Sequence, residues 1–190
     1  SGRTFRNEIF SEYKANRSSP PEDLITQFPI IRKATDAVNV PHVEMLGYEA
    51  DDLIASYAKA AIDQDMKVTI VSSDKDLMQL VKKNISMLDT MKNRLIKENE
   101  VIEKFGVEPN KVIDVQSLAG DSVDNIPGVP GIGIKTASLL INEYGDLDNL
   151  LEKSSNIKQN KRRESLIEFA DQARLSRELV TLKEDIELPI

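Results

Sequence analysis

The chain has 190 residues and a net charge of −7, with 32 acidic against 25 basic residues. It holds no cysteine and one histidine, His42, which excludes disulfides, thiolate metal sites and a histidine-rich metal site. No apolar run approaches the roughly 20 residues that a membrane span needs, and no signal peptide is apparent, so we expect an interior location and no membrane partner. The negative charge argues against a general nucleic-acid coat protein, but metal-binding carboxylates would also produce it.

The first 46 residues predict a polar segment, a helix and a short strand. Residues 1–19 are polar and basic with interleaved aromatic residues. A helix is expected from Pro20, because Ser19 as N-cap and Glu22 form a capping box. Residues 40–46 fit a short strand. The apolar residues that follow the cap at helical spacing predict one buried face: Leu24, Phe28, Ile31 and Val38.

From residue 47 onward, helices and strands alternate. Residues 47–62 predict a helix that opens on three acids, and 66–73 a buried β-branched strand. A short helix (74–81) and a second strand (85–90) follow. This order predicts an α/β fold with a mainly parallel central sheet and flanking helices. From about residue 98 the pattern is helical, with helices expected in 98–106, 109–120, 133–145 and 160–180. We therefore divide the chain into an α/β part (1–97) and a helical part (98–190) of one domain.

Acidic residues fall in three groups at the ends of predicted elements. The groups are Glu49, Asp51 and Asp52; Asp74 and Asp76; and Asp121 and Asp124. Each group alone is also explained by helix capping or turn formation. Ligands of open parallel sheets lie beyond the carboxyl ends of the strands, where the second group falls. Together, three groups at element ends predict an all-oxygen site for Mg²⁺ or Mn²⁺.

A glycine-rich loop follows the third acidic group. Gly131 and Gly133 come directly before a predicted helix, and Lys135 adds a cation in its first turn. Free backbone N–H groups and the helix dipole would then point at one anion. The spacing is neither that of a Walker loop nor that of a dinucleotide-binding loop. Two interpretations remain: a helix–hairpin–helix loop that grips a nucleic-acid phosphate, or a plain hairpin between packed helices.

The motifs "GYEADD", "SSDKDL" and "AGDSVDNIPGVPGIGIKTA", in this order, resemble the 5′ nuclease (flap endonuclease) family over the whole chain. The likeness is strongest to the N-terminal 5′–3′ exonuclease domain of bacterial DNA polymerase I. It implies a PIN-like 5′ nuclease fold with a helix–three-turn–helix in the helical part. It also implies two aspartates on strands upstream of Ser1, so that this sequence corresponds to an N-terminally truncated form of the fold, with residues 1–19 as a remnant of the helical arch.

The resemblance assigns roles by position. All seven acids match metal ligands, and Lys14 and Arg17 match the catalytic cations that engage the scissile phosphate. Tyr13 matches a DNA-binding position beside them, although it is equally expected to pack in a core. The residues that match the duplex-binding loop, with its K⁺ ion, are Gly131, Gly133, Lys135 and Thr136.

The implied function is a structure-specific 5′–3′ exonuclease and flap endonuclease for primer removal and DNA repair. Two divalent ions about 4 Å apart would activate water and stabilise the leaving oxygen. The implied substrate is 5′-flap, nicked or branched DNA, the partner a covalently linked polymerase domain, and the location the bacterial cytoplasm at the nucleoid. Two alternatives remain open: a fragment that binds duplex or flap DNA without cutting it, and a related metal-dependent ribonuclease.

A basic run in the helical part also has two interpretations. It either extends the duplex-binding track or forms a solvated loop. Its members are Lys158, Lys161, Arg162 and Arg163.

Overall fold

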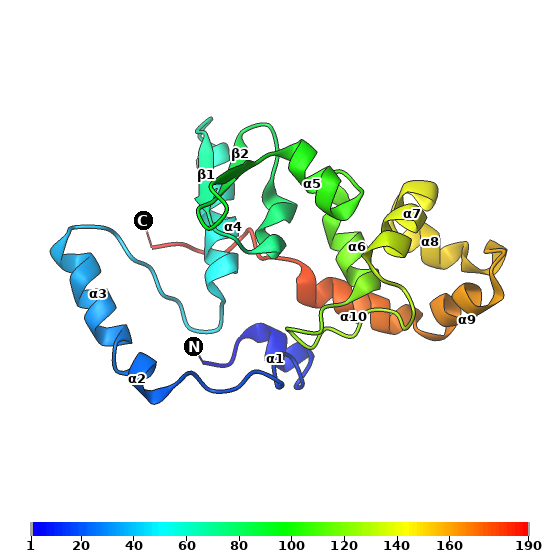
Figure 1. The fold of residues 1–190 in the computed structure, drawn as a ribbon, viewed down its shortest axis with the longest axis horizontal. Helices are drawn as coiled ribbons and strands as arrows, with labels where there is room; N and C mark the ends of the chain where they lie inside the picture. The colour runs from blue at the N-terminus through cyan, green and yellow to red at the C-terminus, as the bar shows by residue number, and fades with distance from the viewer. Residues whose placement is uncertain (1, 190) are drawn as a thin grey trace.

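A computed structural model describes residues 2–189 of the chain (Figure 1). Its sheet has three strands in the order β1 (Val68–Val71), β2 (Ile85–Asp89) and β3 (Arg94–Ile96). β1 runs parallel to β2, and β3 runs antiparallel to it. The α/β class and the first two strands are confirmed. β3 is not apparent from the sequence, because a three-residue strand has too little alternation to predict it.

The other regular elements are helices, joined by turns and irregular chain. Those of the first half are α1 (Phe5–Ile9), α2 (Glu22–Ile25), α3 (Phe28–Ala37), α4 (Ala50–Ile62) and the 3₁₀ helix η1 (Lys75–Leu80). Those of the second half are α5 (Glu98–Phe105), η2 (Pro109–Lys111), α6 (Val112–Ala119), α7 (Ile134–Tyr144), α8 (Leu147–Glu152), η3 (Ser154–Asn156), α9 (Asn160–Glu168) and α10 (Ala170–Val180). None of the helices within residues 2–189 is long and apolar enough to cross a membrane.

One hydrophobic core joins the sheet to the helical half. Leu77 of η1 and Met87 of β2 are fully buried in the same cluster as Leu118 of α6 and Leu166 of α9. α6 is central to the helical half because it packs against both α7 and α10. Burial of this apolar surface stabilises both halves together, so the sheet end and the helical loops are held in a fixed relation.

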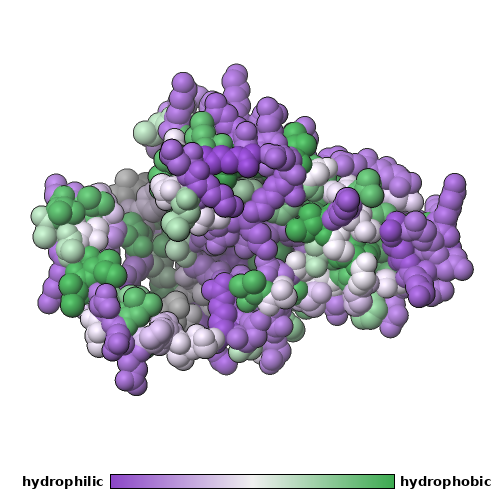
Figure 2. Space-filling model, in the orientation of Figure 1, coloured by the Kyte–Doolittle hydropathy of each residue, from purple (hydrophilic) through white to green (hydrophobic). Residues whose placement is uncertain are grey.

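Residues 20–46 form an arm that stands away from this body (Figure 1). The predicted buried face is wrong: Leu24 is 41% exposed and Val38 69%, and Figure 2 shows apolar residues on the surface of the arm. The predicted capping box at Ser19 is also wrong, because the helix begins at Glu22 with Pro21 as N-cap. A second helix, α3, starts separately around Pro29. The expected strand at 40–46 is irregular chain.

β1 is an edge strand within the described residues. Only Ile70 of this strand is buried, and Val71 is 63% exposed, so the prediction of a fully buried strand is wrong. An apolar groove of about 670 Å³ runs along this edge and is lined by Val43, Leu53 and Tyr57 among others. The β-branched residues of β1 therefore face a groove where the sequence pattern suggested a filled core.

The loop between α6 and α7 closes through two glycines in contact. Gly120 has φ +68 and Gly128 has φ +60, a region that favours glycine. A Cβ on Gly128 would lie 2.4 Å from the amide nitrogen of Gly120. Gly128 is also held by Ser176 of α10, whose Oγ accepts the glycine N–H at 3.0 Å. This close approach fixes residues 121–126 between the two helices.

We expect Gly128→Ala to lower the free energy of unfolding by more than about 2 kcal/mol, because it adds backbone overlap to a strained φ. Gly131→Ala is the matched control, since Gly131 has φ +80 but open space around its Cβ position. It should cost about 1 kcal/mol. Urea denaturation of both variants measures the difference, and equal losses would contradict the role of the close approach.

Candidate active site

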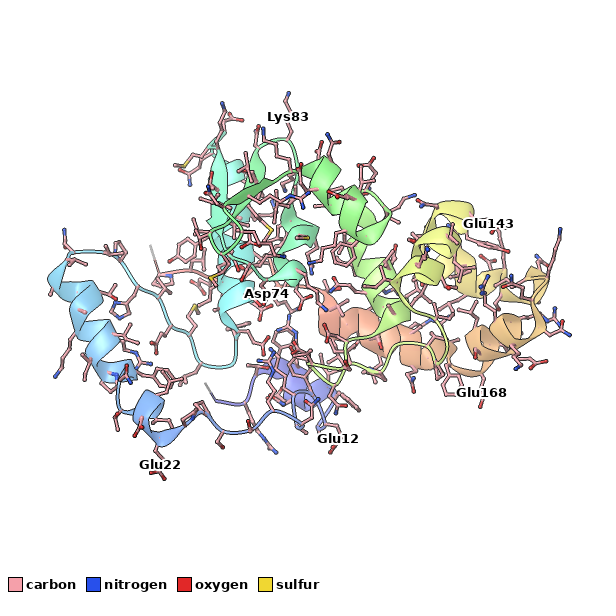
Figure 3. All side chains as sticks on the ribbon, in the orientation of Figure 1. Glu12, Glu22, Asp74, Lys83, Glu143 and Glu168 are labelled. Carbon is pink, nitrogen blue, oxygen red and sulfur yellow. The ribbon has the colours of Figure 1, made fainter. Side chains whose placement is uncertain are left out.

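Four segments meet at the carboxyl end of β1. They are residues 13–17 after α1, the N-terminus of α4, the start of η1, and the loop after α6. Side-chain contacts join them: Lys14 reaches Glu49, Lys75 reaches Asp121, and the Nε2 of Gln116 donates to Asp76. Asp74 lies near the middle of the molecule in Figure 3. The fold therefore brings the three predicted acidic groups to one place.

The N-terminus of α4 carries the first group, and its members have different roles. Glu49 is the N-cap, and Asp51 lies in the first turn, half-buried and with its carboxylate in no ion pair among residues 2–189. Asp52 is 0% exposed, and both its oxygens bond Arg6, at 2.7 and 2.8 Å. They also accept the backbone N–H groups of Glu49 and Lys183. The carboxylate of Asp52 is thus fully committed, and we remove Asp52 from the candidate metal ligands.

The second group follows β1 directly. Asp74 is the N-cap of η1, where its Oδ1 accepts the N–H of Asp76 at 3.0 Å. The Oδ1 of Asp76 accepts the Nε2 of Gln116 at 2.6 Å. Gln116 is buried in α6, and its Oε1 has no hydrogen-bond partner among the described residues. Asp74 therefore has the capping role expected for this group, but capping uses only one of its two carboxylate oxygens.

The third group lies on the loop that the two glycines close. Asp121 and Ile126 exchange backbone hydrogen bonds at 2.9 and 2.7 Å, and the Oδ1 of Asp121 accepts the N–H of Val123. The Oδ2 of Asp121 contacts Lys75. Asp124 contacts Arg17 from the first segment. Both carboxylates are therefore held by cations from other parts of the chain.

Lys14 links the first and third groups. Its φ of +57 is unusual for a lysine, and its N–H donates to the backbone oxygen of Asp124 at 2.9 Å. Its Nζ contacts both oxygens of Glu49, at 2.7 and 2.8 Å, and lies 3.5 Å from Asp124. Such strained backbone is common at functional sites. The predicted cations Lys14 and Arg17 thus lie directly at the acidic cluster.

Tyr13 lies in a small core beside the acidic cluster. It is 5% exposed and packs with Ile126, Leu179 and Val180. Its hydroxyl donates to Glu49 at 3.1 Å. The ring therefore lies inside a core, as one of its two interpretations expected, and a DNA-binding role for Tyr13 stays a prediction. Its hydroxyl helps to orient the Glu49 carboxylate.

Two of the acids that form no ion pair among residues 2–189 have raised pKa values. Burial, followed by repulsion from Asp74 and Glu49, raises the pKa of Asp51 to about 6. Burial and the Asp74 carboxylate also raise the pKa of Asp76, against a hydrogen bond from Gln116 that lowers it. Both shifts mean that the ionised forms are unfavourable here. A bound cation would relieve this repulsion.

Acids with an internal cation behave in the opposite way. Burial acts to raise the pKa of Asp52, but hydrogen bonds from Arg6 and the N–H of Lys183 outweigh it and hold the pKa below its usual range. Burial likewise acts against the ionised form of Asp121, but the hydrogen bond from Lys75 lowers its pKa. The cluster is thus divided into neutralised acids and acids without a counterion.

The donor chemistry fits a hard divalent cation, since carboxylate oxygens are its preferred protein ligands. The raised pKa values of Asp51 and Asp76 point the same way. As placed, however, no three acidic or histidine side chains within residues 2–189 are arranged to hold one ion together. Ion binding would therefore require side chains to move, with Lys14 and Lys75 leaving their carboxylates.

The glycine loop lies apart from the acids, at the start of α7. Gly133 is the N-cap, and its backbone oxygen accepts the N–H groups of Thr136 and Ala137. Gly131 and Gly133 are exposed, with open space where a Cβ would lie, and Lys135 is exposed beside them. Buried Ile132 anchors the loop between them. The predicted loop before a helix is confirmed, and an anion would have free access to it.

Three residues of the site are not among those predicted from the sequence. The sequence does offer a signal for Lys75, because this residue stands between Asp74 and Asp76. Arg6 and Gln116 give no local signal, since their carboxylate partners lie 46 and 40 residues away in the chain.

Two family models together match the whole chain. The model described as the N-terminal resolvase-like domain of 5′-3′ exonuclease covers residues 1–106, and the C-terminal SAM fold of 5′-3′ exonuclease covers 107–190. The chain belongs to the 5′–3′ exonuclease family. The models meet slightly later than the division at 97 and 98, which stays a prediction.

Relatives and solved structures agree with this family. DNA polymerase I of Rhizobium leguminosarum is 57% identical over 190 residues, which are 100% of this chain and 19% of that protein. A 5′-3′ exonuclease of Buchnera aphidicola subsp. Schizaphis graminum is 38% identical over 196 residues, covering 100% of this chain and 68% of that protein. The chain spans about a fifth of the length of the polymerase I relatives it matches.

Among solved structures, the bacteriophage T5 5′-exonuclease with bound zinc has a TM-score of 0.82 and 26% identity, over 94% of this chain and 70% of that one. A T5 flap endonuclease complex with DNA and metal ions has a TM-score of 0.81 and 25% identity, over 95% of this chain and 71% of that one. The predicted 5′ nuclease fold is confirmed.

Neighbouring acids of α4 should respond oppositely to mutation. Asp52→Ala leaves buried Arg6 without its carboxylate and should cost about 3–5 kcal/mol of unfolding free energy. Asp51→Asn should stabilise the protein by about 1–3 kcal/mol at pH 7–8 in chelator, because the Asp51 pKa is raised to about 6 on folding.

The pH dependence follows from the sign of the Asp51 shift. The ionised group destabilises the fold above pH 6, and this cost disappears as the pH falls below about 4, where Asp51 is protonated in both states. Urea denaturation across this range measures it. A benefit of Asp51→Asn that persists at pH 3.5, or a neutral Asp52→Ala, would contradict these assignments.

Proposed function

We propose that this chain is a metal-dependent 5′ nuclease that hydrolyses DNA phosphodiester bonds, as an exonuclease from 5′ ends and as a flap endonuclease. Membership of the 5′–3′ exonuclease family supports this role. The observation that carries it is that Asp51 and Asp76 have raised pKa values and no ion pair among residues 2–189, in the same cluster where Lys14 and Arg17 contact Asp124. Such a pairing suits a divalent cation and a phosphate bound side by side.

Six carboxylates would hold Mg²⁺ or Mn²⁺, in the two positions expected for the family. They are Glu49, Asp51, Asp74, Asp76, Asp121 and Asp124. Ions bound there would supply the positive charge that activates water and stabilises the leaving 3′ oxygen. The metal-bound T5 5′-exonuclease supports a divalent metal in general.

Lys14 and Arg17 would bind the scissile phosphate. Both now contact Asp124, and Lys14 also contacts Glu49. If these carboxylates held a metal ion, Lys14 and Arg17 would be free to bind a phosphate beside it. Their charge would then stabilise the negative charge that builds up on the phosphate during cleavage. Arg17 is half-exposed, so it can reach a substrate without unfolding of the segment.

The loop of residues 131–136 would grip the duplex away from the cut. Its open glycines and Lys135 allow a phosphate to approach backbone N–H groups at the start of α7. A K⁺ ion at this loop belongs to the same proposal. The T5 flap endonuclease complex with DNA supports DNA as the partner. The favoured substrates are 5′-flap, nicked and branched duplexes, processed during primer removal and repair at the nucleoid.

A covalently linked polymerase domain is a further part of the proposal. It is supported by the polymerase I relatives, of which this chain matches about a fifth. One observation favours the alternative of a DNA-binding module that does not cut: the acids within residues 2–189 are not arranged as a three-ligand metal site. Cleavage in Mg²⁺ separates the two functions.

We expect Asp74→Ala to lower Mg²⁺-dependent cleavage of a 5′-flap DNA by at least about 100-fold, because a ligand on the cluster is lost. Binding of the same DNA in chelator should be unchanged or tighter, since one negative charge is removed. Glu143→Ala is the control, as Glu143 lies on the helical half away from Asp74 (Figure 3). Full cleavage by Asp74→Ala would contradict the metal assignment.

Lys135→Glu should weaken binding of duplex DNA by about 3- to 10-fold and reduce the slope of log K against log salt by about one. Lys67→Glu controls for the change in net charge, because Lys67 precedes β1, at the end of the strand away from the acidic cluster. Fluorescence anisotropy over a salt series measures both variants. An unchanged slope for Lys135→Glu would show that the loop holds no phosphate.

A further inference from the structure

Lys75 has an unexpected partner. It lies between Asp74 and Asp76 in the chain, yet its ammonium contacts Asp121, 46 residues away on the loop after α6. The Asp121 side chain is 7% exposed and that of Lys75 35%. A buried carboxylate thus receives its cation from a side chain that keeps a path to solvent.

Arg17 is half-exposed, and the three cations of the cluster with buried or half-buried side chains are held differently. Arg6 is buried and bonds Asp52 together with two backbone oxygens. Lys14 is shared between two carboxylates. Lys75 has a single partner among the described residues, and only the hydrogen bond to Asp121 holds its ammonium. Among Arg6, Lys14 and Lys75, it is therefore Lys75 that loses the fewest contacts when it leaves its carboxylate.

Asp121 lies where the unneutralised acids need a cation. The Asp76 carboxylate is repelled by both Asp74 and Asp121. The Oδ1 of Asp121 accepts the N–H of Val123, so a divalent ion among these groups would bind the Oδ2 that Lys75 now contacts. Two positive charges cannot both lie within hydrogen-bonding distance of one oxygen without strong repulsion. Ion and ammonium must therefore exclude each other at Asp121.

We propose that Lys75 is an exchangeable counterion of Asp121, which keeps this carboxylate neutralised until a divalent ion displaces it, and which thereby sets the metal affinity of the site. The inference rests on the proposed metal site but assigns a residue outside it. Lys75 is a positioning residue, since it acts through Asp121. The opposite role, in which Lys75 orients Asp121 for the metal, predicts weaker metal binding when Lys75 is lost.

Calorimetric titration of the whole chain with Mn²⁺, without DNA, tests whether loss of Lys75 strengthens or weakens metal binding. Lys75→Met should bind Mn²⁺ about tenfold more tightly than the unmodified chain, since no ammonium has to be displaced. Lys75→Arg keeps the charge and should stay within about twofold. Lys83→Met removes one positive charge from the turn before β2, away from Asp74 (Figure 3), and should also stay within about twofold.

A second neutral variant, Lys75→Gln, guards against a folding defect in Lys75→Met, and thermal unfolding in chelator checks both. Unchanged or weaker Mn²⁺ binding by the neutral variants, with binding by the unmodified chain intact, overturns the role of Lys75 alone. Absence of Mn²⁺ binding in every variant overturns the metal site and this inference together. Binding seen only in the neutral variants supports the exchange.

Discussion

The buried ion pair between Arg6 and Asp52 is the constraint on which the site depends. Arg6 is 1% exposed and Asp52 is fully buried, and the guanidinium also donates to the backbone oxygens of Leu179 and Thr181. The pair therefore ties α1, the start of α4 and the end of α10 to one point. A bidentate pair of this kind tolerates little displacement, because loss of one partner leaves a buried charge. It fixes the helix N-terminus that carries the catalytic candidates of the first acidic group.

The acids of the cluster around this ion pair differ in whether a cation neutralises them. Asp52, Asp121 and Asp124 each have a cation from a distant segment, whereas Asp51, Asp74 and Asp76 form no ion pair among residues 2–189. Stability favours the first set, since paired acids cost less to bury. In the second set, the raised pKa values of Asp51 and Asp76 mean that their ionised forms lower stability in the absence of a cation, and such local cost is common at functional sites. The same acids that the fold supports least are those that suit a metal ion best.

Sequence patterns predicted the features that depend on residues close together in the chain. The helix after Glu49, the strand around Ile70 and the loop before α7 follow from caps, β-branched runs and glycines. The arm was misjudged, because helical spacing of apolar residues predicts an amphipathic helix but not what covers it. The pairing of Asp52 was not predicted for a related reason: its partner Arg6 is distant in sequence, and three adjacent acids give no hint of which one is neutralised. The roles of the acids depend on pairing between residues that are distant in the chain, and a single sequence does not reveal these pairs.

The most direct test of the account is a crystal structure of the chain soaked in Mn²⁺, with anomalous scattering to locate the ion. The account predicts Mn²⁺ among Asp51, Asp74, Asp76 and Asp121, with the ammonium of Lys75 moved away from Asp121 and the Arg6–Asp52 pair unchanged. Absence of Mn²⁺ from these carboxylates, or an ion bound by Asp52 with Arg6 displaced, would contradict it.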